Sequence, residues 1–243
     1  MGITCIDRFN ILISRIWDDI VLKRVNDIEE KSDYTYHHVI IPWVTDKIIE
    51  YTNNKSMILD IGCGCGYLTE HIYQQGRTNI IGMDISKVSI EYARKKYPYI
   101  SFKEEDFYKI DDKNHYDLCL GNMLVNNIPD IKLFFETVAR ILKHDGILIL
   151  TIPHPCFWPE RHICNQNYNY MQESYFRLPF ATKGCHTYRT NVVYFHRPIE
   201  RYLEECEEAG LSLLDYHEMT EITTDSKPDL LGLVLLKRNG RKL

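Results

Sequence analysis

One short stretch constrains the fold of this chain more than any other. Residues 58–68 read Ile-Leu-Asp-Ile-Gly-Cys-Gly-Cys-Gly-Tyr-Leu, the pattern of a buried strand, a glycine loop and the start of a helix. Alternating glycines let the backbone adopt unusual dihedral angles and pass close to a ligand, and the following helix presents free N–H groups there. The stretch therefore predicts a nucleotide-type binding loop in an α/β protein.

Around this loop, short β-branched runs alternate with amphipathic stretches, as in parallel sheets built from βαβ units. We predict strands at residues 57–61, 78–84, 99–103, 116–121, 147–152, 211–217 and 230–237. We predict helices at residues 68–75, 86–96, 131–142 and 198–209. Ser86 and Asp130 are expected N-caps, and a turn at 144–146 is expected before the fifth strand. The predicted fold class is α/β: a Rossmann-like, seven-stranded, mostly parallel sheet with helices on both faces and an antiparallel last strand.

The chain divides into three parts by pattern. Residues 1–56 show helical periodicity and predict an N-terminal helical cap of two or three helices. Residues 57–243 form the predicted core. Within that core, residues 153–197 break the strand–helix rhythm and carry ten aromatic side chains and four prolines in 45 positions. We interpret them as an aromatic-rich lid inserted after the fifth strand.

Composition and patterning disfavour several classes of protein. The net charge of −5 over 243 residues lacks the basic excess of a nucleic-acid binder. The apolar runs are far shorter than the roughly 20 residues that a membrane span needs, and residues 1–8 match no targeting signal, so a cytoplasmic protein is expected. The eight cysteines are expected to be reduced thiols, and their spacing with the histidines predicts no metal site.

Two carboxylates follow the second and third predicted strands. Asp84 and Asp106 are thus expected at the carboxyl edge of the sheet, where ligands bind in open α/β folds. Asp84 suits ribose hydroxyls, and Asp106 suits an adenine amine. A dinucleotide site would need its third glycine one residue later, where Tyr67 stands, so pyrophosphate binding is disfavoured.

These residues resemble the class I S-adenosylmethionine-dependent methyltransferases, whose first motif D-x-G-x-G-x-G matches residues 60–66. The resemblance implies that the glycines hold the methionine part of S-adenosylmethionine, that Asp84 binds the ribose and that Asp106 binds adenine. It also implies that residues 121–124 face the sulfonium. The cofactor-binding residues expected on this basis are Asp60, Gly62, Cys63, Gly64, Gly66, Asp84, Ile85, Asp106, Phe107, Asn122 and Met123.

A narrower resemblance concerns the outer segments. Residues 36–38, 152–157 and 194–198 are similar to those of bacterial small-molecule methyltransferases, many of which serve specialised metabolism. His154 and His196 are expected at the carboxyl edge, where either imidazole can act as a general base or only shape the pocket. The expected substrate pocket comprises Trp17, Tyr36, His37, Phe157, Trp158 and Tyr194.

The sequence thus predicts methyl transfer from S-adenosylmethionine to a nitrogen or oxygen of a small organic acceptor, in natural-product biosynthesis. The N-terminal amine of a short peptide is an alternative acceptor. An NAD-dependent oxidoreductase and a non-catalytic cofactor-binding protein are the rival classes. No nucleic-acid or membrane partner is expected, and the sequence leaves open whether the chain forms a homodimer.

Overall fold

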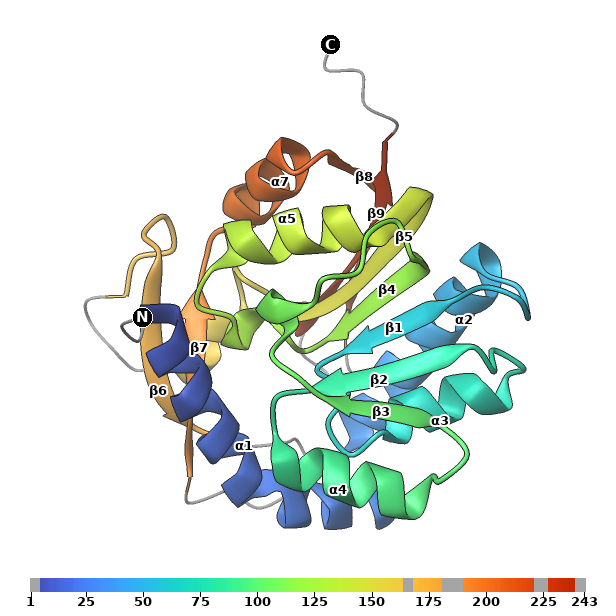
Figure 1. Ribbon diagram of the computed structural model, residues 1–243. Coiled ribbons are helices and arrows are strands. Elements are labelled where there is room, and N and C mark those ends of the chain that lie inside the picture. The colour runs from blue at the N-terminus through green and yellow to red at the C-terminus, as the bar shows by residue number, and fades with distance from the viewer. Residues whose placement is uncertain (1–4, 164–167, 181–189, 221–226, 239–243) are drawn as a thin grey trace.

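A seven-stranded sheet forms the centre of the molecule in the computed structural model, which describes residues 5–163, 168–180, 190–220 and 227–238. Its strands lie in the order β3-β2-β1-β4-β5-β9-β8 (Figure 1). They are β1 Ile58–Ile61, β2 Ile80–Asp84, β3 Ser101–Glu104, β4 Tyr116–Asn122, β5 Leu142–Pro153, β8 Leu211–Met219 and β9 Leu230–Lys237. The predicted α/β fold class is confirmed.

Strand direction creates the edge at which a ligand can bind. Strands β1 to β5 pair in parallel, whereas β9 pairs antiparallel with both β5 and β8. The chain moves outward from β1 through β2 to β3 and then returns to the other side of β1 at β4. Connections therefore diverge beside β1, and this reversal opens a crevice at the carboxyl ends of the strands.

Helices cover both faces of the sheet, as Figure 1 shows. On one face lie α2 (Ile41–Tyr51), α3 (Tyr67–Gln74) and α4 (Lys87–Lys96), and on the other lie α5 (Ile131–Ile141) and α7 (Ile199–Glu208). The central strands β1, β4 and β9 are buried on both faces, whereas the edge strands β3 and β8 are partly exposed. This explains why the sequence shows continuous apolar runs in place of alternating ones.

The predicted helix starts at α4 and α5 are confirmed. The side chain of Ser86 accepts a hydrogen bond from the backbone N–H of Ser89, and that of Asp130 accepts one from Leu133. Each oxygen satisfies a backbone donor that the first turn of a helix leaves free.

Strand β5 begins earlier than predicted. It starts at Leu142, which pairs with Tyr116, and the register then shifts so that Ile147 pairs with Leu118. Residues 144–146, predicted as a turn, form a bulge inside the strand, where Asp145 has φ +60°. A bulge of this kind inserts extra residues without ending the pairing.

The N-terminal part consists of α1 (Cys5–Glu29), a π-helical turn η1 (Tyr36–Ile40) and α2. Val44 and Ile48 of α2 pack in the same apolar cluster as Ile58 of β1. Helix α1 instead packs against α4 and the inserted hairpin. The proposed boundary at residue 56 stays a prediction.

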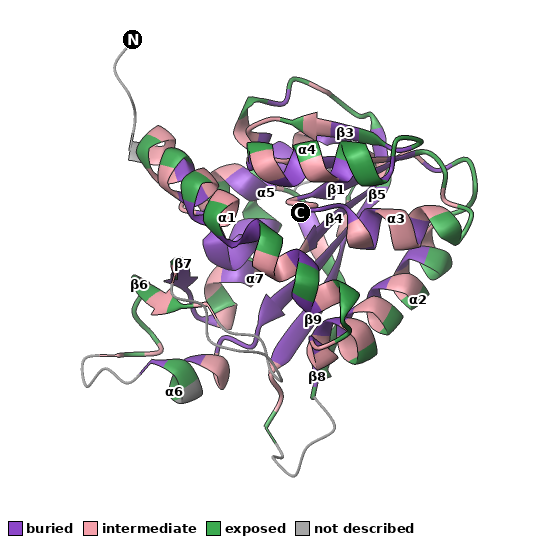
Figure 2. Ribbon diagram, turned by 90° about the horizontal axis from the view of Figure 1, so that it is seen from below, coloured by how far each residue is buried: buried purple, intermediate pink, exposed green. Residues whose placement is uncertain are grey.

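The insertion after β5 contains α6 (Trp158–His162) and an antiparallel hairpin of β6 (Ser174–Pro179) and β7 (Asn191–His196). Val193 and Phe195 pack against apolar residues of α1. Figure 2 shows α6 and β6 at one side of the molecule, with β6 next to the buried strand β7. In the part of the chain that the structure describes, no helix is long and apolar enough to cross a membrane.

Close packing between α2 and the sheet gives a first prediction. A Cβ atom on Gly232 of β9 would lie 2.5 Å from ring carbons of Trp43. We expect Gly232→Ala to lower the free energy of unfolding by about 1–3 kcal/mol through overpacking, measured by urea denaturation. Trp43→Phe removes those ring carbons, so the double variant should recover part of the loss. Equal losses with and without Trp43 would contradict this account.

Candidate active site

The glycine loop after β1 is tied to the end of β2 by one carboxylate. Asp84 accepts hydrogen bonds from the backbone N–H of Gly64 at 2.8 Å and from that of Ser86 at 2.7 Å. Gly62, Gly64 and Gly66 have φ of +72°, +54° and +78°, which side chains disfavour. The loop therefore needs these glycines to adopt its path.

The three loop glycines differ in how much free space lies beside them. Gly62 and Gly66 are packed against other side chains, whereas Gly64 has room for a ligand. A Cβ atom on Gly66 would lie 2.6 Å from the ring of Phe102, and one on Gly62 would lie 2.7 Å from Leu124. A Cβ atom on Gly64 would meet no atom of the described residues within 4 Å. The backbone at Gly64 thus borders open space, directly beside the carboxylate of Asp84.

Burial sets the charge of the two carboxyls near the loop. It raises the pKa of Asp84, while the backbone N–H groups of Ser86 and Gly64 lower it. It raises the pKa of Asp60 to about 7, and the hydroxyl of Thr69 donates to this carboxyl at 2.6 Å. Asp60 is therefore a buried structural acid, whereas the Asp84 carboxylate, which has the backbone N–H groups of Gly64, Ser86 and Ile85 as donors, keeps acceptor capacity for a ribose hydroxyl.

The two loop cysteines are thiols at neutral pH. Burial raises the pKa of Cys63, and it raises that of Cys65 to about 12. The described residues contain no group of three His, Cys, Asp or Glu side chains placed to hold a metal ion.

Asp106 lies where the sequence places an adenine contact. Its carboxylate accepts from the N–H of Tyr108 at 3.1 Å and from the amide nitrogen of Asn10 at 3.0 Å. It borders a cavity of about 300 Å³ together with Ile85 and residues of α1. The side chain of Phe107 lies in the core, 5.3 Å from the ring of Phe134.

Helix α1 contacts the carboxyl edge of the sheet through a row of polar side chains that the sequence analysis did not identify. Asn10, Ser14 and Asp18 recur every four residues and so share one helical face. Asn10 contacts Asp106, and Ser14 donates to the carbonyl of Ile85 at 3.1 Å. Asp18 accepts from the Ser86 hydroxyl at 2.6 Å and from the Val88 N–H at 3.2 Å. The four-residue spacing was the available signal.

The residues after β4 also contact their neighbouring strand. Asn122 accepts a hydrogen bond from the hydroxyl of Thr151 at 2.6 Å, and the N–H of Met123 donates to the carbonyl of Thr151 at 2.9 Å. Met123 has φ +51°, an uncommon angle for a side chain of this size. The chain thus turns sharply at the carboxyl edge, close to the glycine loop through the Leu124–Gly62 contact.

His154 has both ring nitrogens occupied. Nδ1 accepts from the N–H of Cys156 at 3.3 Å, and Nε2 lies 3.1 Å from a carboxylate oxygen of Glu218. Because a carboxylate only accepts, Nε2 carries the proton. The side chain is 1% exposed and stacks on Phe157 at 4.7 Å.

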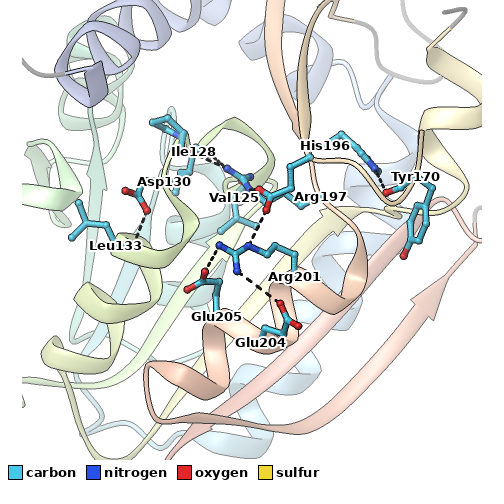
Figure 3. Close-up of polar contacts among 12 residues, drawn as sticks. Val125, Ile128, Asp130, Leu133, Tyr170, His196, Arg197, Arg201, Glu204 and Glu205 are labelled. Atoms are coloured by element: carbon cyan, nitrogen blue, oxygen red, sulfur yellow. Dashed lines mark hydrogen bonds and ion pairs between the residues drawn. The ribbon is translucent and has the colours of Figure 1, made fainter. Parts of the chain in front are cut away.

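His196 differs from His154 in the hydrogen bonding of its Nδ1 atom. Its Nε2 lies 2.8 Å from the carbonyl oxygen of Tyr170, so Nε2 is the protonated nitrogen (Figure 3). Its Nδ1 is buried and has no hydrogen-bond partner among the described residues. Burial lowers the pKa of His196. The imidazole is therefore neutral at physiological pH and keeps a free lone pair.

The structure brings only part of the expected substrate pocket together. Trp158 lies 4.4 Å from Tyr194, and Tyr194 lies 6.5 Å from His196. Trp17 instead packs against Phe180 at 5.4 Å.

Tyr36 and His37 lie in the N-terminal part. Tyr36 is buried in the apolar cluster under α2, with the Arg24 guanidinium 5.4 Å from its ring centre. His37 hydrogen-bonds the carbonyl of Ile28 at 2.9 Å and so joins η1 to the end of α1.

A sequence model of the methyltransferase domain family matches residues 52–210, which include the glycine loop, Asp84, Asp106 and the turn after β4. The chain belongs to this family. Its cofactor is S-adenosylmethionine. The open space at Gly64 and the free lone pairs of Asp84 fit the adenosyl group, as does the cavity beside Asp106. Because the matching family model is that of a methyltransferase domain, the rival assignment to an NAD-dependent oxidoreductase is wrong.

Known methyltransferases resemble this one over much of its length. A ubiquinone biosynthesis O-methyltransferase of Pelagibacter ubique is 26% identical over 60% of this chain, and the match spans 62% of that relative's length. The enzyme of the same description from Bartonella bacilliformis is 27% identical, with 74% of this chain and 72% of the relative covered. A crystal structure of an S-adenosylmethionine-dependent methyltransferase from Clostridium acetobutylicum has TM-score 0.63 and 17% identity, covering 87% of this chain and all of the other.

The methyltransferase site predicts a specific loss of cofactor affinity. Asp84→Asn should weaken binding of S-adenosylhomocysteine about 10- to 100-fold, because a neutral amide loses charge-assisted acceptance from ribose hydroxyls. Isothermal titration calorimetry measures the change. Asp145→Asn, on an exposed turn away from the loop, is the matched control and should bind normally. Equal affinity in wild type and Asp84→Asn would refute the ribose assignment.

Proposed function

We propose that this methyltransferase transfers the methyl group of S-adenosylmethionine to a hydroxyl oxygen of a small organic acceptor, with His196 as the general base. The observation that carries the proposal is Nδ1 of His196, which is buried and has no hydrogen-bond partner in the described part of the chain. A hydroxyl loses its proton as it is methylated, and an imidazole lone pair can receive that proton. A setting in natural-product biosynthesis and a nitrogen acceptor stay predictions.

His196 suits the base role better than His154. The carbonyl of Tyr170 fixes its tautomer by accepting from Nε2, which leaves Nδ1 as the basic atom. His154 has no comparable free lone pair, because Nδ1 already accepts from the Cys156 N–H. We therefore assign His154 a positioning role, in which it joins the segment after β5 to Glu218 of β8.

An oxygen acceptor is supported by the relatives, whose names describe O-methylation. A second cavity of about 300 Å³ lies beside the inserted hairpin, where Phe195 and Arg197 line it but His196 does not. Its walls include the rings of Phe9, Tyr175 and Phe195, which lie 5.5–6.0 Å from one another. Small-molecule sites are typically concave with a few polar groups, and this cavity is also lined by the charged residues Asp130, Lys132, Glu173, Arg197 and Arg201.

Bound S-adenosylmethionine supplies an activated methyl group. The chain orients the reactants, excludes water and supplies a proton acceptor. Asp84 orients the ribose, α1 covers the adenine edge, and the turn at Met123 borders the glycine loop. The acceptor oxygen forms a bond to the methyl carbon as the carbon–sulfur bond breaks. The proton of that hydroxyl is then held at Nδ1 of His196, and S-adenosylhomocysteine is the second product.

Matched glutamine variants of the two histidines test these roles. His196→Gln should lower kcat about 100-fold or more because it removes the general base, with the affinity for S-adenosylhomocysteine unchanged. His154→Gln should retain most of the turnover. The assay follows methyl transfer to 3,4-dihydroxybenzoate by mass spectrometry, beside a short peptide with a free N-terminus. Exclusive methylation of the peptide, or equal turnover by wild type and His196→Gln, would contradict the proposal.

The pH profile gives an independent test. Burial and the charge of Arg197 lower the pKa of His196 below its ordinary value of 6.5, although the Tyr170 carbonyl and Glu173 act in the opposite direction. Below that pKa the imidazole is protonated and cannot accept a proton. We expect the acidic limb of the kcat profile to be centred below pH 6.5 and to disappear in His196→Gln. An acidic limb centred above pH 6.5 would rule out this assignment.

A further inference from the structure

Helix α1 forms much of the wall of the cavity beside Asp106. This cavity of about 300 Å³ is lined by Asn10, Ser14 and other residues of α1, by Ile85 after β2 and by Asp106 after β3. Figure 1 shows α1 lying between the inserted hairpin and α4. A base bound beside Asp106 is therefore bordered by side chains of α1 as well as by the edge of the sheet.

Asn10 is the α1 residue that contacts the carboxylate of Asp106. It is 8% exposed, and its amide nitrogen Nδ2 donates to Oδ2 of Asp106 at 3.0 Å. Because a carboxylate only accepts, this bond fixes which end of the amide faces Asp106. In the part of the chain that the structure describes, no group donates to the amide oxygen Oδ1 of Asn10. A buried amide that lines a cavity thus keeps an acceptor for a ligand.

Asp106 also keeps acceptor capacity at this cavity. Its Oδ1 accepts from the N–H of Tyr108 at 3.1 Å, and its Oδ2 accepts from Asn10 and lies 3.6 Å from Nζ of Lys109. Each carboxylate oxygen has two lone pairs, so the carboxylate can accept from a further donor. Acceptor oxygens from two different elements, α1 and the loop after β3, therefore line one cavity. The exocyclic amine of adenine has two N–H donors, whereas a 6-oxo purine has a carbonyl oxygen in that position.

We infer that Asn10 determines the base specificity of the cofactor site, with Oδ1 accepting one N–H of the adenine amine while Asp106 accepts the other. A 6-oxo base would place its own acceptor against these two acceptors and leave buried polar groups unpaired. Asn10 lies outside residues 52–210, which the family model matches, so this specificity comes from the N-terminal helix of this chain. The inference does not depend on which acceptor is methylated.

Paired ligands test this role by isothermal titration calorimetry. Wild type should bind S-adenosylhomocysteine about 100-fold more tightly than S-inosylhomocysteine, which carries the 6-oxo base. Asn10→Leu has similar volume but lacks the amide, and it should lower this ratio about 10-fold by weakening binding of S-adenosylhomocysteine. Asn26→Leu makes the same change on an exposed face of α1 and is the matched control, which should keep the wild-type ratio.

A second variant separates recognition of the base from support of the helix. Ser14 lines the same cavity, but its hydroxyl donates to the carbonyl of Ile85 and so holds α1 against the sheet edge. Ser14→Ala should therefore weaken both ligands to the same extent and leave their ratio unchanged. If Asn10→Leu behaves in the same way, Asn10 only positions α1 and the inference is wrong.

A gain of binding excludes a folding defect as the cause of these changes. The probe is S-adenosylhomocysteine with one methyl group on the adenine amine, which has a single N–H left. Wild type should bind it about 10-fold more weakly than S-adenosylhomocysteine. Asn10→Ala leaves room for the methyl group and should bind this probe more tightly than wild type does. Equal affinity of wild type for the two ligands, or no gain in Asn10→Ala, would overturn the assignment.

Discussion

The carboxylate of Asp84 is the contact on which the binding site depends. By accepting from Gly64 and Ser86, it links the glycine loop after β1 to the start of α4 after β2. Parallel strands place both loops at the same edge, and hydrogen bonds to the carboxylate offset the cost of its burial. One partly buried group therefore shapes the loop and also presents lone pairs to a ribose.

Two segments far apart in sequence complete the site by contacting backbone as well as side chains. Ser14 of α1 reaches the carbonyl of Ile85, and Asp18 reaches the N–H of Val88. Arg197 similarly reaches the carbonyls of the loop after β4. Contacts of this kind position a loop precisely while leaving the side chains of that loop available for ligands. They explain how a common fold can present an individual acceptor site.

Much of the fold could be predicted because local signals agree with the global arrangement. The strand–glycine–helix pattern at residues 58–68, the cap residues Ser86 and Asp130, and the apolar runs of the parallel strands all favour the same sheet. The start of β5 was missed because a strand bulge with Asp145 at positive φ has the same composition as a turn. The residue types at 144–146 indicate a turn, but they do not show that β5 pairs with β4 on both sides of it.

Only the part of the candidate site that belongs to the glycine-loop motif could be predicted from the sequence. Asp84 and the glycine loop are adjacent in the fold because the topology requires it. The two histidines were equivalent in sequence, and their hydrogen bonds distinguish them.

The most direct test of the account is a crystal structure of the complex with S-adenosylhomocysteine. It should place both ribose hydroxyls on the Asp84 carboxylate, the homocysteine part along the backbone at Gly64, and the adenine beside Ile85 and Asp106 beneath α1. A ligand bound away from the Gly64 loop, or a ribose that does not contact Asp84, would contradict it.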